Sequence, residues 1–143
     1  MSKNIPRILN LTVHRTTPEQ ALQGVFDPVN KKLTRKLMKF KHKPTLEELV
    51  DRARQLGDIA AAHVPDAAMI SGPPYLVPIL FFELVQRGIT PLFAYSSYKK
   101  KNENGDFRHE GFVDITHSLL DLEKQQVLAL GSIGGVGLVA EKS

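Results

Sequence analysis

The chain has 143 residues, the length of one domain, and a formal net charge of +4 at pH 7. It contains no cysteine, which excludes disulfides, thiolate–metal sites and a cysteine nucleophile. The N-terminus lacks the apolar run of a signal peptide, and no window reaches the roughly 18 apolar residues of a membrane span. We therefore expect a cytoplasmic protein without a membrane partner. Its pI of about 9.4 favours an anionic partner.

Helical and extended patterns alternate along the chain. Residues 7–14 contain a nearly continuous apolar set, Ile8, Leu9, Leu11 and Val13, as in a strand covered on both faces. Thr17, Pro18 and Gln20 follow in the order of a helix cap, a first helical residue and a capping-box partner, and this short helix should end at Gly24. Two helices are predicted next: a basic amphipathic helix within 30–43, and a helix from about 46 to 63 opened by a capping box at 45–48. A strand at 67–71 and a bend at 72–74 should lead into a well buried helix that ends at Gly88 and includes Phe82 and Val85. The remaining predicted elements are a strand at 90–96, a hairpin that turns at 104–105 and returns along 106–115, a helix at 119–126 and a strand at 127–130.

This order predicts an α/β fold: a mainly parallel sheet with right-handed crossovers, flanked by helices, with an antiparallel C-terminal hairpin. One domain should span residues 1–130. The glycine-rich segment at 131–137 resembles a dinucleotide loop, but no helix can follow it, so residues 131–143 are expected to form a flexible tail. Because ligands of such sheets bind beyond the carboxyl ends of the strands, three loops are of interest, at 14–17, 71–75 and 95–101.

Two of these loops carry groups suited to phosphate. Ser71 and Gly72 offer a hydroxyl and backbone N–H groups ahead of a helix. The alternative, favoured when the motif is taken alone, is a plain strand-to-helix turn in which Gly72 only allows the geometry. His14 suits general acid–base work or phosphate binding, and ordering of its loop is an equal alternative. Thr17 is better explained as a helix cap.

The third loop holds the richest cluster. Residues 95–98, with the sequence YSSY, precede three lysines. Aromatic rings stack on bases, hydroxyls hold phosphate or ribose, and lysines neutralise phosphate charge. For the lysines, a solvated sheet edge is the preferred interpretation. For Ser96 a functional role is preferred, because it is predicted to end its strand at the cleft. Arg108 and His109 should point to opposite faces of the returning strand.

The basic helix within 30–43 has two interpretations. It suits contact with nucleic acid, but a solvated helix face is favoured. The five histidines are scattered and no carboxylate cluster appears, so neither a metal site nor a cofactor is expected.

Several segments, in this order, resemble the small CRISPR-associated ring-nuclease-like proteins, which are related to CARF domains. The segments are ILNLTVH at 8–14 with TPEQ at 17–20, AMISGPPY at 68–75, GITPLFAYS at 88–96 and FRHEGFV at 107–113. The resemblance covers most of residues 8–113 and leaves out the basic insert. In such proteins an arginine often stands two residues after the strand-ending serine. Here Tyr98 holds that place and Lys99 follows, which bears on catalysis more than on binding.

The resemblance implies a compact Rossmann-like domain that binds cyclic oligoadenylate across the two-fold axis of a homodimer in antiviral defence, or in its suppression by phage. Some relatives cleave the ring without metal, through the ligand's own 2′-OH, and others sequester it. The residues expected to act in catalysis or charge neutralisation are His14, Lys99 and Arg108. Those expected to bind the ligand are Thr16, Ser71, Gly72, Pro73, Tyr75, Tyr95, Ser96, Ser97 and Tyr98.

Three hypotheses therefore remain. The first is a dimeric cyclic-oligonucleotide binder, with or without ring-nuclease activity. The second is a non-catalytic nucleic-acid-binding protein that uses the basic helix at 31–43. The third is a nucleotide-metabolising enzyme on the same fold. A cleft at the strand ends favours the first and third, and a convex basic face favours the second.

Overall fold

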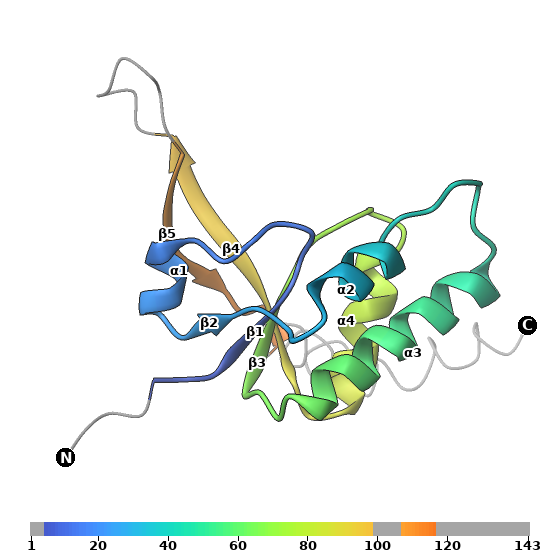
Figure 1. The fold of residues 1–143 in the computed structure, drawn as a ribbon, viewed down its shortest axis with the longest axis horizontal. Helices are drawn as coiled ribbons and strands as arrows, with labels where there is room; N and C mark the ends of the chain where they lie inside the picture. Colours follow the sequence, from blue (N-terminus) through green and yellow to red (C-terminus); the bar gives the residue numbers. More distant parts are fainter. Residues whose placement is uncertain (1–4, 99–106, 117–143) are drawn as a thin grey trace, which may run out of the picture.

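Residues 5–98 and 107–116 are described by a computed structural model of the chain (Figure 1). In these residues, strands and helices follow one another in the alternating order expected from the sequence. The elements are β1 (Ile8–Leu11), α1 (Pro18–Leu22), β2 (Val25–Phe26), α2 (Lys31–Leu37), α3 (Leu46–Ala62), β3 (Ala67–Ile70), α4 (Val77–Gln86), β4 (Thr90–Tyr98) and β5 (Phe107–Val113). None of these helices has the length and apolarity that crossing a bilayer requires.

The five strands form one mixed sheet in the order β2-β1-β3-β4-β5. The first four are parallel, and β5 runs antiparallel to β4. Pairing between β3 and β4 ends at Met69 and Leu92, whereas β4 pairs with β5 from Phe93 to Tyr98. The second half of β4 therefore leaves the parallel sheet as a two-stranded ribbon with β5 (Figure 1). The predicted α/β fold is confirmed, and it is Rossmann-like.

The core lies mainly on one face of the sheet. Alternating strand side chains such as Leu9 and Leu11 point to the face where α3 and α4 supply Leu56 and Leu80, and all four are fully buried. A smaller cluster on the other face consists of Ile8, Val25, Ala67 and Met69. Helices α2, α3 and α4 lie on one side of the strands and α1 on the other (Figure 1).

Most local predictions hold, and the ends of elements differ. The Thr17 capping box is present in full. At Thr45 only half of the expected box forms, because Glu48 pairs with Arg52 instead of the cap backbone. The basic helix ends at Leu37, earlier than expected. Strand β2 was not predicted, since two residues are too short to show a period.

Three further expectations about boundaries and burial were wrong. The first strand ends at Leu11, not at His14, because the chain turns at Thr12. The helix after Gly72 begins only at Val77, so no helix N-terminus stands at Ser71 and Gly72. Phe82 on α4 is 62% exposed, so this helix is buried on one face only. The turn at 104–105, the elements expected at 119–130 and the tail at 131–143 lie outside the described residues.

Candidate functional site

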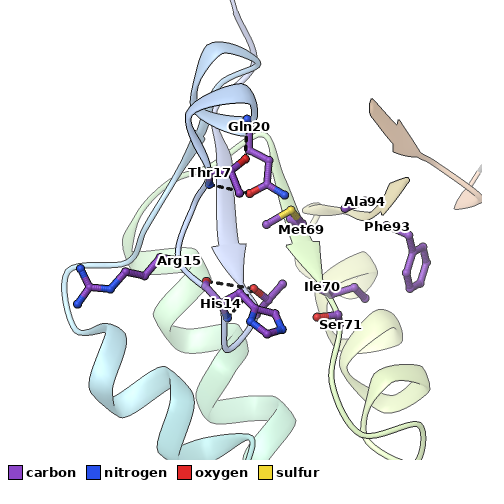
Figure 2. A pocket seen from close by; sticks show the side chains of 10 residues that line it. His14, Arg15, Thr17, Gln20, Met69, Ile70, Ser71, Phe93 and Ala94 are labelled. Atoms are coloured by element: carbon purple, nitrogen blue, oxygen red, sulfur yellow. Dashed lines mark hydrogen bonds between the residues drawn. The ribbon is translucent and has the colours of Figure 1, made fainter. Parts of the chain in front are cut away.

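A cleft opens at the carboxyl ends of β1 and β3, beside the middle of β4, where ligands are expected in this fold class. Its volume is about 340 Å³. The chain leaves β1 toward α1 and β3 toward α4, on opposite sides of the strands, so the cleft lies at the topological switch point of the sheet. The residues that line it are Thr12, His14, Arg15, Thr17, Gln20, Met69, Ile70, Ser71, Phe93 and Ala94 (Figure 2). We call this the strand-end cleft.

Two exposed polar residues, His14 and Ser71, are among those that line the strand-end cleft. The imidazole of His14 points toward Ser71, and both residues are exposed (Figure 2). Arg15 contributes to the lining, but its guanidinium extends away from the cleft. The floor is apolar and comes from Met69 and Ile70 at the end of β3 and from Phe93 and Ala94 in the middle of β4. This combination of an apolar floor and a few converging polar groups is typical of small-molecule sites.

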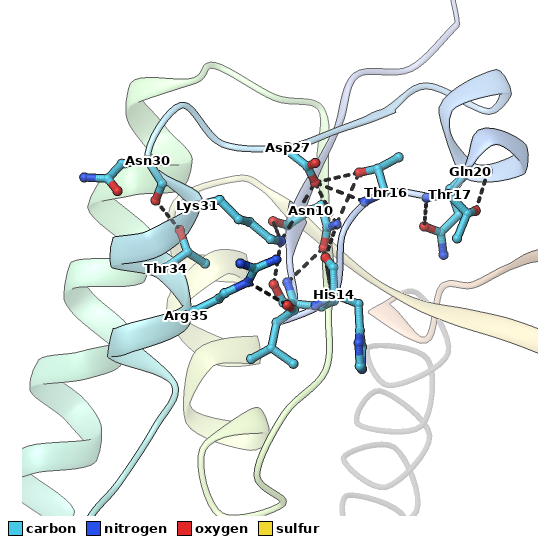
Figure 3. Close-up of polar contacts among 12 residues, drawn as sticks. Asn10, His14, Thr16, Thr17, Gln20, Asp27, Asn30, Lys31, Thr34 and Arg35 are labelled. Atoms are coloured by element: carbon cyan, nitrogen blue, oxygen red, sulfur yellow. Dashed lines mark hydrogen bonds and ion pairs between the residues drawn. The ribbon is translucent and has the colours of Figure 1, made fainter.

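The loop that carries His14 is held by Asn10, the last polar residue of β1, which is fully buried. Its Oδ1 accepts hydrogen bonds from the backbone nitrogen and the hydroxyl of Thr12, at 2.9 and 2.7 Å. Its Nδ2 lies 2.8 Å from the carbonyl oxygen of His14 and 3.2 Å from the hydroxyl of Thr16. Asn10 therefore ties both ends of the loop to the sheet (Figure 3). A single asparagine in an apolar strand forms no recognisable pattern, so the role of Asn10 could not be predicted from the sequence.

Asp27 and Lys31 stabilise the same loop from the segment after β2. Oδ1 of Asp27 accepts from Asn10 Nδ2 at 2.9 Å and from the Thr16 hydroxyl at 2.8 Å. Nζ of Lys31 donates to the carbonyl oxygen of Thr12 at 2.6 Å and lies 3.8 Å from Asp27 (Figure 3). Neither residue was singled out from the sequence, because Lys31 is hidden in the run of basic residues.

The environment shifts the pKa of both charged groups. Burial lowers the pKa of Lys31 to about 8, against the opposing effect of the Asp27 charge and with a further lowering from Arg35. Burial acts to raise the pKa of Asp27, but hydrogen bonds from Thr16 and Asn10 and the charge of Lys31 together bring it below its ordinary value. Asp27 thus stays an acceptor for its neighbours at neutral pH.

The structure brings together only some of the residues that the sequence predicted for the site. His14 and Ser71 line the strand-end cleft, while Thr16 lies behind it, bonded to Asp27. Gly72 has a φ of +141°, and the carbonyl of Pro73 accepts from the backbone nitrogen of Leu76, so both belong to the turn before α4. Tyr75 does not line the cleft and packs edge-on against Phe40 at 5.6 Å between ring centroids.

The predicted cluster at 95–98 lies on the ribbon beyond the cleft. Ser96 does not end its strand, because β4 continues to Tyr98, and the β4 residues that line the cleft are Phe93 and Ala94. Tyr95 is 55% exposed, and a register shift separates it from Ser96. Ser97 pairs with Arg108, and Tyr98 with Phe107, across the ribbon. Lys99 lies outside the described residues.

His109, on β5, contacts an element that the sequence did not connect to it. Its Nε2 lies 3.0 Å from Oε1 of Gln23, at the end of α1, and its ring packs edge-on against Phe112 at 4.9 Å. This contact ties the ribbon to the helix whose capping residues line the strand-end cleft.

The strand-end cleft offers an imidazole and a hydroxyl above an apolar floor, so its residues can form hydrogen bonds to a small ligand. His14 can donate a hydrogen bond or exchange a proton, and Ser71 offers a hydroxyl. Within residues 5–98 and 107–116, no three His, Asp or Glu side chains gather in a way that could hold a metal ion. Comparisons with protein-family models, with curated proteins and with solved structures find no match. The sheet topology confirms the Rossmann-like fold that the family resemblance implies, whereas the comparisons do not identify the family.

Proposed function

We propose that this protein binds a cyclic oligoadenylate, or a closely related cyclic nucleotide, in the strand-end cleft. The observation that carries the proposal is the position of His14 and Ser71 in a cleft at the switch point of a mainly parallel sheet. Nucleotides bind at this place in Rossmann-like folds. The segments that resemble ring-nuclease-like proteins include β1 and β3 together with the residues that follow them, His14 and Ser71.

The size of the cleft supports binding as a homodimer. Its volume of about 340 Å³ lies near the lower end of the range for small-molecule sites. A ring of several nucleotides exceeds that volume, so a second copy of the chain would complete the site across a two-fold axis. Light scattering at high micromolar concentration, with and without ligand, tests this assembly. A monomer mass in both conditions would contradict it.

If the protein cleaves the ring, the attacking group would be the ligand's own 2′-OH. Its oxygen forms a bond to the adjacent phosphorus while the bond from phosphorus to the 5′-oxygen breaks. The proton of the 2′-OH passes to a base, for which His14 is suited, and the 5′-oxygen takes up a proton as it leaves. The products carry a 2′,3′-cyclic phosphate and a 5′-hydroxyl. If no cleavage occurs, the protein sequesters the messenger.

The test begins with calorimetry, using a cyclic adenylate and a linear oligoadenylate of equal length. We expect tighter binding of the cyclic form, and equal or weaker cyclic binding would overturn the proposal. Incubation with the ring then separates cleavage from sequestration. For a cleaving protein, His14→Ala should reduce the rate by about 100-fold or more if His14 transfers a proton. An unchanged rate would assign it a role in shaping the loop. Loss of cleavage with a chelator, and its return with a divalent metal, would contradict the metal-independent route.

A further inference from the structure

A second hollow lies between α2, the connection at 38–45, and α3. Its volume is about 710 Å³. It is lined by Lys32, Arg35, Lys36, Lys39, Lys41, His42, Glu48 and Arg52. We call this the basic groove. It shares no lining residue with the strand-end cleft, so it is a separate site. The sequence suggested that these basic residues cover a solvated helix face. In the structure they surround one concave surface.

The charge of the basic groove is strongly unbalanced. Six of its eight lining residues are lysine or arginine, and its single carboxylate, on Glu48, lies 3.5 Å from a nitrogen of Arg52. The side chains of Lys32, Lys36 and Lys39 make no hydrogen bond or ion pair with any residue in the described ranges. Several ammonium groups thus face the same space, and a polyanion there would relieve their mutual repulsion.

The wall of the basic groove is fixed by Arg52. One of its nitrogens donates to the carbonyl oxygens of Lys36, Leu37 and Lys39, at 3.3, 2.9 and 2.9 Å. These bonds tie the end of α2 and the following connection to α3. Its guanidinium also lies over the ring of Phe40, 4.6 Å from the centroid. The backbone that carries the lysines is therefore held around the groove before any ligand arrives.

An exposed aromatic ring stands beside this wall. Tyr75 packs edge-on against Phe40, on which Arg52 lies, and Tyr75 remains 47% exposed. Proteins that bind single-stranded nucleic acid combine a positively charged groove for the backbone with aromatic rings on which bases stack. A flexible single strand can follow a concave groove and reach such a ring, whereas the bases of a duplex are already stacked on one another.

We propose that the basic groove binds the phosphate backbone of a single-stranded nucleic acid, with Tyr75 stacking on one of its bases. The site is distinct from the strand-end cleft. A protein of this design would read a cyclic nucleotide at one place and contact a nucleic acid at another.

The experiment measures fluorescence anisotropy of a labelled single-stranded RNA of roughly 12 nucleotides, a length that covers one such binding site, over a series of salt concentrations. We compare the full chain with a variant carrying Lys32→Gln, Lys36→Gln and Lys39→Gln. Glutamine keeps the helix propensity of lysine, so the fold should persist. Three fewer phosphate contacts should reduce the slope of log affinity against log salt by about 2 and weaken binding at least about tenfold at low salt.

Single substitutions localise the effect. Lys36→Gln should weaken RNA binding more than Arg54→Gln, which removes the same charge from an exposed position on α3 that lines a different hollow. Tyr75→Leu should weaken binding at least about fivefold, and Tyr75→Phe, which keeps the ring, should have little effect. Equal effects of Lys36→Gln and Arg54→Gln, or no effect of Tyr75→Leu, would overturn the proposal.

Calorimetry with the cyclic adenylate separates this proposal from the proposed function. The triple lysine variant should keep its affinity for the ring within about fivefold, allowing for a long-range electrostatic loss. RNA binding that is lost in the variant supports the basic groove whether or not the cyclic ligand binds. Binding of phosphatidylserine vesicles through these lysines, without RNA binding, would overturn the proposal and assign the groove to a membrane surface.

Discussion

The side-chain nitrogen of Asn10 lies 2.9 Å from Oδ1 of Asp27, and this contact joins the end of β1 to the segment that follows β2. Because Asn10 also bonds to both ends of the loop after β1, the position of His14 depends on a contact between residues 17 positions apart. The strand-end cleft is therefore shaped by a buried polar network as much as by the strands.

Asn10→Ala should destabilise the protein by about 3 kcal/mol, because it leaves several buried hydrogen-bonding groups without a partner. Urea unfolding measures the change. Asn30→Ala serves as the control: Asn30 is an exposed helix cap that accepts from the backbone nitrogen of Leu33, and its loss should cost about 1 kcal/mol. If Asn10→Ala lowers the free energy of unfolding by no more than Asn30→Ala does, the hydrogen bonds around Asn10 contribute little to stability.

The lowered pKa of Lys31 predicts a dependence of stability on alkaline pH. In the folded protein this pKa is about 8, against 10.5 as its ordinary value. Between these two values the unfolded chain binds more protons, so the Lys31 contribution to the free energy of unfolding should rise with pH. Below pH 8 Lys31 is charged in both states, and the unfavourable effect of burying that charge is present in full.

Denaturant unfolding from pH 7 to pH 10.5 tests this dependence. The stability of the unmodified protein relative to Lys31→Met should increase over the upper part of the range. Lys32→Met provides the matched control, because Lys32 is an exposed neighbour without a hydrogen bond in the described part of the chain. Parallel pH profiles for all three proteins would contradict the prediction.

The placement of the two serines predicts unequal roles in binding. Ser71 lines the strand-end cleft, whereas Ser96 lies on the β4–β5 ribbon. Ser71→Ala should weaken binding of a cyclic adenylate by about 1 kcal/mol, the value of an ordinary hydrogen bond, and by more if the partner is charged. Ser96→Ala should have a smaller effect in calorimetry. The reverse order would place the ligand on the ribbon.

Gly24 and Gly88 both have a positive φ, and replacing each by alanine distinguishes the effect of a steric clash from that of backbone strain. Gly24 has a φ of +100°, and a Cβ there would overlap the carbonyl oxygen of Pro6 and lie 2.8 Å from Ile5 Cγ2. Gly88 has a φ of +75°, with open space around a Cβ. Gly24→Ala should therefore cost about 3 kcal/mol or more, and Gly88→Ala about 1 kcal/mol, in thermal or denaturant unfolding. Similar losses at both positions would mean that the chain near Pro6 moves aside.

Elements that depend on neighbouring residues could be predicted from the sequence. The cap formed by Thr17, Pro18 and Gln20 involves residues three apart, and α3 follows from a repeated apolar spacing. The α/β class follows from the order of such elements. In each case the hydrogen bonds and the buried face depend on neighbours within one or two turns, so a single chain segment contains the information.

Which side chains meet at the site depends on contacts between elements that are distant in the sequence. Asn10 and Lys31 act through partners on other elements, and nothing near them in the sequence indicates this. Ser96 is placed beyond the strand-end cleft because β3 stops at Ile70 while β4 continues to Tyr98. Tyr75 stands beside the basic groove because it packs against Phe40. These cases share one cause: strand lengths, registers and long-range contacts are set by packing between elements, which local sequence patterns do not encode.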